Sequence, residues 1–158
     1  MTTLRYRIPD EPRPTGMAHL AVDPLWPLLT LMLAGNGIGL LWFAINSRAL
    51  GSPTAMKEAF CIALSVAGCV ALGVGLNWCR QQALLSDEGL AYAALSIEAL
   101  KLGIGYALYL SQSRCAELIQ HYGGILRNGA VVAILATVIL RPTLADVPMH
   151  ALLAGALK

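Results

Sequence analysis

The sequence predicts an all-helical membrane protein in which four transmembrane helices form a bundle and the third helix extends beyond the bilayer. Three observations predict this class. Of the 158 residues, 57% are hydrophobic and only 13% are charged, whereas a soluble domain carries about 25% charged residues. The sequence contains four long apolar runs, and turn signals separate these runs. At this length the chain is one domain; the alternative, a very oily soluble bundle, is disfavoured by runs this long.

We divide the chain into a tail, a membrane domain and a second tail. Residues 1–23 read as irregular, and they lack the apolar core and cleavage site of a signal peptide. Residues 24–142 form the transmembrane domain. Its spans are expected at about 25–48, 55–79, 89–111 and 125–141. Residues 143–158 form the C-terminal tail.

The first two spans are expected to form a tight antiparallel hairpin. Residues 25–46 contain no ionisable side chain, and a span needs about 20 such residues. Gly51 can close the first helix in a left-handed conformation. Ser52 can cap the second helix, with Pro53 in its first turn.

The third helix is expected to be longer than the bilayer requires. Ser86 with two following acidic residues makes a good helix start. The helix could run unbroken to about Tyr122, where Gly123 and Gly124 stop it, a length of about 54 Å. The fourth span is short and ends or kinks at Pro142. Residues 143–158 are apolar enough for a short interfacial helix, and the sequence leaves these alternatives open.

The orientation in the membrane is undecided from the sequence. Four spans place both termini on one side. That side, with the middle loop, holds Arg5, Arg7, Arg13, Arg80, Arg141 and Lys158, and the two hairpin turns hold Arg48, Lys57, Arg114 and Arg127. Only basic residues near the spans set the orientation. Omitting the distant Arg5, Arg7 and Lys158 leaves the two sides nearly equal.

Every predicted span carries small residues at helical spacing. In lipid, close approach of backbones through such residues drives helix association. Internal packing of the bundle accounts for most of these rows, and a surplus would allow contact with a partner helix or a second copy. The helix-packing candidates are Gly35, Gly39, Cys69, Gly73, Gly75, Ala99, Gly103, Ala107 and Gly129.

Two opposite charges, Glu98 and Lys101, lie near the middle of the third span. A lone charge at that depth costs at least about 2.5–3.5 kcal/mol. At a spacing of three residues the two side chains are neighbours and can neutralise each other. We therefore favour a structural pair over an ion or proton relay. Asn36, Ser96 and Tyr106 are candidate polar partners of this pair.

No pattern in the sequence indicates an enzyme, a cofactor site or a nucleic-acid interface. There is no phosphate-binding loop, no H-E-x-x-H motif and no run of basic residues. Cys61 and Cys69 lie about 12 Å apart on one helix, too far for a disulfide. With Cys79 and Cys115 they show no metal-ligand spacing, and we expect no metal.

The stretches "INSRALGSPTA" and "QSRCAELIQHYGGILRNGAVVAI" carry a family resemblance. The chain resembles a group of small, four-span bacterial inner-membrane proteins that have an Asn-x-Arg-x-Leu-Gly turn after the first span. These relatives also have a Gln, a His and a Gly pair before the last span. The matching positions are Asn46, Arg48, Leu50, Gly51, Gln112, His121, Gly123 and Gly124. The resemblance implies that the hairpin turns face the cytoplasm, and it implies no reaction or substrate.

We therefore expect a non-enzymatic, multi-pass protein of a bacterial inner membrane. It would self-associate or bind a partner's membrane segments, as an accessory subunit or as an immunity protein against a membrane-active toxin. The alternative is a small oligomeric channel or transporter in which Glu98 and Lys101 line the path.

Overall fold

The computed structural model describes residues 15–140, and over this range the protein is helical, with no strand. The elements are η1 (Ala18–Leu20), α1 (Leu25–Leu33), α2 (Asn36–Ala49), α3 (Ala55–Gln81), α4 (Asp87–His121), α5 (Ala130–Leu135) and η2 (Ala136–Leu140). The all-helical class is confirmed. The tail residues 1–14 and 141–158, with Pro142 and the proposed interfacial helix, lie outside the described residues.

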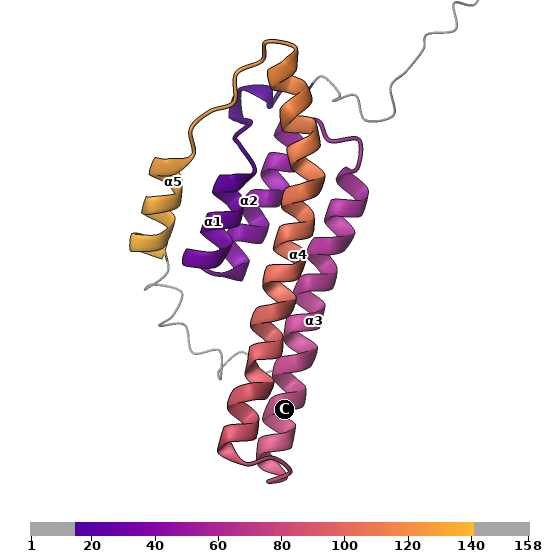
Figure 1. Cartoon of the computed structure of the whole chain (residues 1–158), viewed down its shortest axis with the longest axis vertical. Helices are drawn as coiled ribbons and strands as arrows, with labels where there is room; N and C mark the ends of the chain where they lie inside the picture. Colours follow the sequence, from indigo (N-terminus) through magenta and orange to yellow (C-terminus); the bar gives the residue numbers. More distant parts are fainter. Residues whose placement is uncertain (1–14, 141–158) are drawn as a thin grey trace, which may run out of the picture.

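The helices α3 and α4 form a long antiparallel hairpin that runs the whole length of the molecule (Figure 1). Both are long and apolar enough to cross a membrane. They correspond to the second and third predicted spans. The Ser86 hydroxyl accepts a hydrogen bond from the Gly89 N–H at 3.2 Å, as expected of a helix cap. At the other end, the Gly124 N–H donates to the Ile119 carbonyl at 2.8 Å, which ends α4 where the glycine pair predicts.

The first predicted span, 25–48, is not one helix. The apolar run breaks between α1 and α2, and the two short helices pack against each other (Figure 1). Gly35 at the break has a φ of +110° and a ψ of 167°, a conformation that is essentially restricted to glycine. A Cβ on Gly39 would overlap the Leu31 backbone. These two glycines therefore allow the chain to reverse and the two arms to touch.

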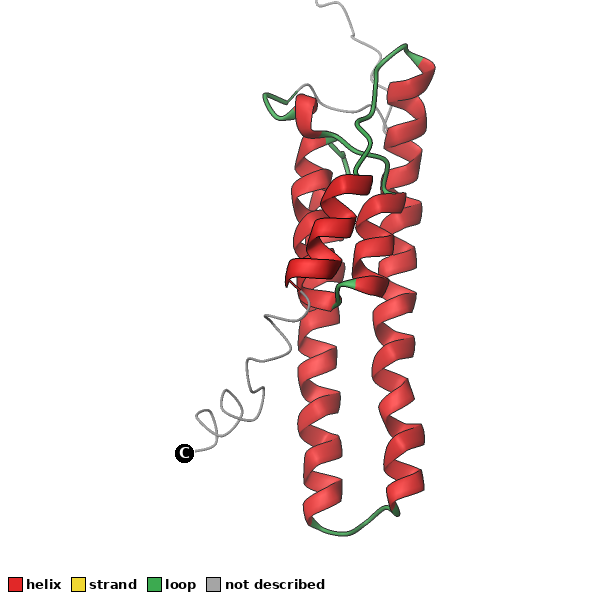
Figure 2. Cartoon of the chain, turned by 90° about the vertical axis from the view of Figure 1, so that its left-hand side faces the viewer, coloured by secondary structure: helices red, strands yellow, loops and turns green. Residues whose placement is uncertain are grey.

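Both ends of the α1–α2 hairpin lie at the same end of the molecule, which we call the near end. There the Val22 N–H donates to Asn46 Oδ1 at 3.0 Å, and the Arg127 N–H donates to the Ala21 carbonyl at 2.9 Å. The turn between α2 and α3 also lies there, with Gly51 in the expected left-handed conformation at φ +63°. The opposite end, which holds the α3–α4 loop at 82–86, is the far end (Figure 2).

The tip of the α1–α2 hairpin reaches only the middle of α3. The Asn36 amide contacts the Cys69 sulfur at 3.7 Å, and Cys69 lies halfway along α3. The core is confined to the near half, where Leu31, Leu40, Phe43 and Leu108 form one cluster. No residue described between Ser65 and Gly105 is buried. Within residues 15–140, the far halves of α3 and α4 therefore pack only on each other.

The fourth predicted span, 125–141, starts later than expected. Residues before Ala130 form a non-helical strap, because the Arg127 backbone pairs with Ala21 and Val22 instead of continuing a helix. The helical part, 130–140, is about 16 Å long at 1.5 Å per residue. Within the described residues two helices, α3 and α4, are long and apolar enough to span a membrane, and the four-span bundle stays a prediction.

Candidate functional site

A buried carboxylate near the α2–α3 turn is the centre of a hydrogen-bonded network. Glu58 in the first turn of α3 is 2% exposed. Its Oε1 accepts from the hydroxyls of Ser52 at 2.5 Å, Thr54 at 2.7 Å and Ser111 at 3.0 Å. Its Oε2 accepts from Gln112 Nε2 at 2.9 Å. No cation pairs with Glu58 among residues 15–140, so neutral donors alone compensate the buried charge.

The network continues across α4 to α2. Gln112 is fully buried, and its Nε2 also donates to the Phe43 carbonyl at 2.9 Å. Its Oε1 accepts from Asn46 Nδ2 at 2.9 Å, and Asn46 Oδ1 accepts from the Val22 N–H. One chain of hydrogen bonds thus joins the N-terminal segment, α2, α4 and α3. Buried polar groups that are fully satisfied in this way fix one arrangement of the helices around them.

Two backbone groups set the direction of this hydrogen-bond chain. The Val22 N–H is a fixed donor, so Asn46 must present its oxygen there and its amide NH₂ to Gln112. The Phe43 carbonyl is a fixed acceptor, so the Gln112 NH₂ must face it and Glu58. Neither amide can be flipped without losing two bonds, which resolves the usual ambiguity of amide orientation. Position 58 must therefore offer an acceptor.

The sequence identified Asn46 and Gln112 only as parts of a turn motif, and it missed Glu58, Ser52, Thr54 and Ser111 as members of one site. The expected cap of Ser52 on the second helix is replaced by its bond to Glu58, and the helix begins after Thr54 instead. A carboxylate four residues after Thr54 was the available local signal. The contribution of α4 has no local signal, because Ser111 is more than 50 residues away from Glu58.

The remaining residues of the turn motif lie around this network without entering it. Arg48 and His121 are exposed, and the His121 ring lies edge-on to Tyr122. Gly123 and Gly124 end α4. The role of this glycine pair is therefore to terminate α4.

The predicted charge pair is formed on the outer surface of α4. Lys101 Nζ lies 2.8 Å and 2.9 Å from the two oxygens of Glu98. The Glu98 side chain is 59% exposed and that of Lys101 19%. Leu100 packs on Gly68 of α3, so the pair lies at the level of the hairpin tip. The pair therefore lies where the far halves of α3 and α4 begin, and no other element of the described chain covers these halves.

None of the three candidate polar partners hydrogen bonds to this pair. Asn36 contacts Cys69, the Ser96 hydroxyl donates to the Ala93 carbonyl at 2.5 Å, and the Tyr106 ring stacks on Tyr109 with centroids 6.0 Å apart. The pair is compensated within itself.

The predicted small residues divide into two groups. Gly35 and Gly39 shape the α1–α2 hairpin, and a Cβ on Gly129 would lie 2.8 Å from the Trp26 Cβ. By contrast, Gly73, Gly75 and Gly103 have open space where a Cβ would be, and Ala99 and Ala107 are exposed. The long helices instead make close contacts at Gly68, against Leu100, and at Gly105, against Leu31. Sequence reasoning did not single out these two glycines.

Residues 15–140 contain no group of three or more His, Cys, Asp or Glu side chains that could hold a metal ion. A comparison of the chain with protein-family models, curated proteins and solved structures finds no match. The resemblance based on the Asn-x-Arg-x-Leu-Gly turn stays a prediction. The function must therefore be argued from the geometry.

Proposed function

We propose that the protein is an integral protein of a bacterial inner membrane in which α3 and α4 cross the bilayer and α1–α2 forms a re-entrant hairpin. Large apolar side chains such as Phe60, Val70 and Trp78 of α3 are exposed along its length. Water would disfavour such a surface, whereas hydrocarbon accommodates it. The arms α1 and α2 are about 13 Å and 21 Å long, too short for some 30 Å of hydrocarbon.

The re-entrant hairpin also supports one of the two orientations that the sequence left open. Because both arms start and end at the near end, Arg48, Lys57, Arg114 and Arg127 all belong to that end, and among residues 15–140 only Arg80 lies at the far end. Basic residues near the spans favour the cytoplasmic side. We place the near end in the cytoplasm, which agrees with the expectation from the family resemblance.

Within this placement the protein acts as a non-enzymatic interaction protein. It packs a further membrane helix, from a second copy or from a partner, against the far halves of α3 and α4. The observation that supports this most is the Glu98–Lys101 pair, which lies mid-depth on a surface that the described chain does not cover. Charges exposed to lipid at that depth are costly even when paired, and a covering helix removes them from lipid.

Open positions along the uncovered halves of α3 and α4 favour close approach of another helix. Gly73, Gly75 and Gly103 leave open space there, and small residues let two backbones come close enough for strong packing in lipid. The uncapped tip of the α1–α2 hairpin adds to this argument, since no side chain caps the start of α2. Free backbone groups at membrane depth need protein or water beside them.

Crosslinking tests the proposal. In a chain whose four cysteines are replaced, Leu95→Cys places a thiol on the uncovered surface, and Val138→Cys places a similarly exposed thiol on η2. We expect thiol crosslinks to a second copy or to a partner from Leu95→Cys, and few from Val138→Cys. Purification as a lone monomer in mild detergent, together with no crosslink from Leu95→Cys in the native membrane, would show the proposal to be wrong.

A small oligomeric channel is the second candidate. The tip of the α1–α2 hairpin and the Glu98–Lys101 pair lie at the same depth. This favours the channel, because half-helices that end at mid-depth are typical of transport sites. The double variant Glu98→Gln with Lys101→Met discriminates the two. Loss of an ion flux in a protein that still folds and inserts would support the channel, whereas unchanged flux with intact crosslinking would support the interaction protein.

A further inference from the structure

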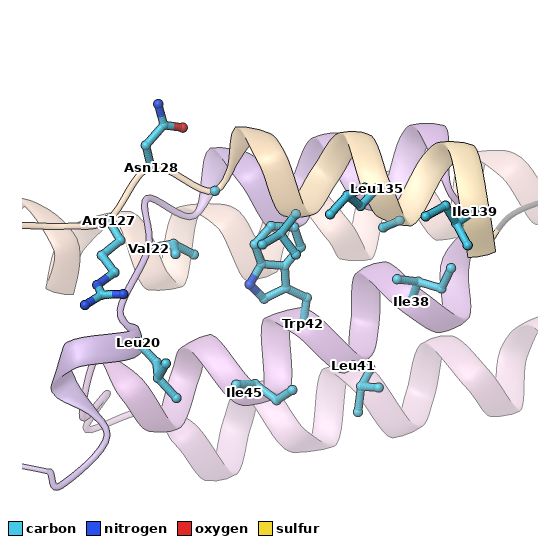
Figure 3. A pocket seen from close by; sticks show the side chains of 13 residues that line it. Leu20, Val22, Ile38, Leu41, Trp42, Ile45, Arg127, Asn128, Leu135 and Ile139 are labelled. Carbon is cyan, nitrogen blue, oxygen red and sulfur yellow. The ribbon is translucent and has the colours of Figure 1, made fainter.

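A groove of about 680 Å³ lies between α2 and the helical segment formed by α5 and η2, which we call α5–η2 (Figure 3). Its volume falls in the range of about 300–1,000 Å³ that is typical of small-molecule sites. One wall consists of Ile38, Leu41, Trp42 and Ile45, and the other of Val132, Leu135, Ala136 and Ile139. None of the lining residues belongs to α3 or α4, and α5 lies on the side of α1–α2 that faces away from α3 (Figure 1), so the groove is separate from the proposed assembly surface.

The two ends of the groove differ in chemistry. Arg127 lies at the near end and is exposed, and no carboxylate within the described range pairs with it. Its backbone N–H is fixed by the Ala21 carbonyl. The indole nitrogen of Trp42 is on the side of the ring that faces Arg127 (Figure 3), and no hydrogen bond to it is present in residues 15–140. The opposite end, at Ile38 and Ile139, is wholly apolar.

The length of the groove matches one leaflet. From Gly129 to Ile139, α5–η2 rises about 15 Å, which is half of the roughly 30 Å of hydrocarbon in a bilayer. In the proposed orientation, Arg127 lies at the level of the cytoplasmic headgroups and Ile139 at mid-depth. The cytoplasmic leaflet is the one that carries anionic lipid.

We infer that this groove binds one anionic phospholipid of the cytoplasmic leaflet. One acyl chain lies between α2 and α5–η2, the phosphate pairs with the Arg127 guanidinium, and an ester oxygen accepts from the Trp42 indole N–H. The charge complementarity at one end and the length of the apolar walls select this occupant over a polar solute. The inference rests on the proposed membrane placement.

Fluorescence quenching by lipids with brominated acyl chains tests this site. With Trp26→Phe and Trp78→Phe, Trp42 is the remaining indole, and it lies in the groove. The protein is reconstituted in vesicles that mix phosphatidylglycerol and phosphatidylcholine, with one of the two brominated in each sample. We expect phosphatidylglycerol to be preferred at Trp42 by about fivefold, the factor that corresponds to one basic residue at a membrane surface.

Three variants make the result specific. Arg127→Gln should reduce the preference to about onefold, whereas Arg127→Lys should retain most of it because the charge is kept. Arg48→Gln removes another exposed near-end cation outside the groove, and it should leave the preference unchanged. No preference in the parent chain, or a preference that survives Arg127→Gln, would overturn the inference.

Two further outcomes separate this inference from the proposed function. A chain that does not float with the vesicles overturns the membrane placement and the lipid site together. A floating chain whose Trp42 is quenched by neither lipid overturns the lipid site alone, because the groove is then filled by protein, such as residues 141–158 or a second copy.

Discussion

Asn46 and Gln112, which are 66 residues apart in the sequence, face each other through a 2.9 Å hydrogen bond between the Asn46 amide and the Gln112 side-chain oxygen. Both side chains are essentially inaccessible to solvent. This contact joins the end of the α1–α2 hairpin to α4, one of the two helices long enough to cross a membrane. Through Gln112 it also reaches the carboxylate of Glu58, so the same buried amide holds both the α1–α2 hairpin and the first turn of α3.

Replacing Gln112 by Leu should destabilise the fold strongly. The change leaves Asn46 Nδ2 and one Glu58 oxygen without their partner and removes the side-chain bond to the Phe43 carbonyl, which keeps its bond within α2. Each buried unsatisfied group costs about 1–3 kcal/mol. We expect the free energy of unfolding to fall by roughly 2–4 kcal/mol, measured by denaturing-detergent titration in mixed micelles. Gln120→Leu, at an exposed position of α4, is the control and should have little effect.

Glu58→Gln should destabilise the protein although the two side chains have the same shape. Because the Gln112 NH₂ has a fixed direction, the new side chain must turn its oxygen to Gln112 and its NH₂ group to the three hydroxyls. These hydroxyls all donate to Glu58 Oε1 and would have to rotate to accept instead, and the two N–H groups cannot serve all three. We expect a loss of about 1–3 kcal/mol in the same titration. Glu117→Gln, exposed near the end of α4, should stay within about 0.5 kcal/mol. Equal stability of the two variants would contradict the network as described.

Gly39→Ala should disrupt the α1–α2 hairpin. The added methyl group would overlap the Leu31 backbone, and overpacking of this kind costs about 1–3 kcal/mol. Gly37→Ala is the matched control in the same helix, because open space surrounds the position of its Cβ. There the better helix propensity of alanine should stabilise by up to about 1 kcal/mol. Thermal unfolding in detergent distinguishes the two, and a Gly39→Ala variant as stable as Gly37→Ala would refute the close contact.

Single cysteines test the re-entrant path directly. In a chain without its natural cysteines, Asp23→Cys and Arg48→Cys precede α1 and end α2, respectively. They should react with a membrane-impermeant maleimide from the same side of the membrane, whereas a straight first span would place them on opposite sides. Gln82→Cys in the far-end loop is the control and should react from the other side. In intact cells, we expect only Gln82→Cys to be labelled.

The charge pair should show strong coupling between its two members. Lys101→Met leaves Glu98 unpaired at mid-depth, and we expect it to reduce membrane insertion by the equivalent of about 2.5–3.5 kcal/mol. Adding Glu98→Gln to the same chain should restore most of the loss, because no charge then remains. A glycosylation-based insertion assay measures both variants, and a double variant worse than Lys101→Met would show that the pair has a further role.

Local chemistry made the long helices predictable. The cap at Ser86, the glycine pair after Tyr122 and the uninterrupted apolar pattern specify α3 and α4 through contacts within a few residues, and the two helices lie where these signals put them. The reversal at Gly35 was not predicted. The local signal there was Gly-Asn-Gly, a turn pattern, but the absence of charges over residues 25–46 favoured one continuous span.

The network around Glu58 could not be derived from the sequence, because its members come from four separate segments. Which hydroxyl or amide faces the carboxylate depends on the relative rotation of α2, α3 and α4, and helical periodicity does not specify it. The charge pair was predictable because both of its members lie on one helix, at neighbouring positions.

If α1–α2 is re-entrant, as we propose, this hairpin also has a consequence for how the protein is made. Residues 25–49 leave the ribosome before the helices that support them, and neither arm is long enough to be retained by the translocon as a membrane segment of its own. The surface on which they dock is completed only when Gln112 has been synthesised. The α1–α2 hairpin is therefore translated before α3 and α4 but can reach its place only after both of them are made, and in the proposed placement it depends on them to enter the bilayer.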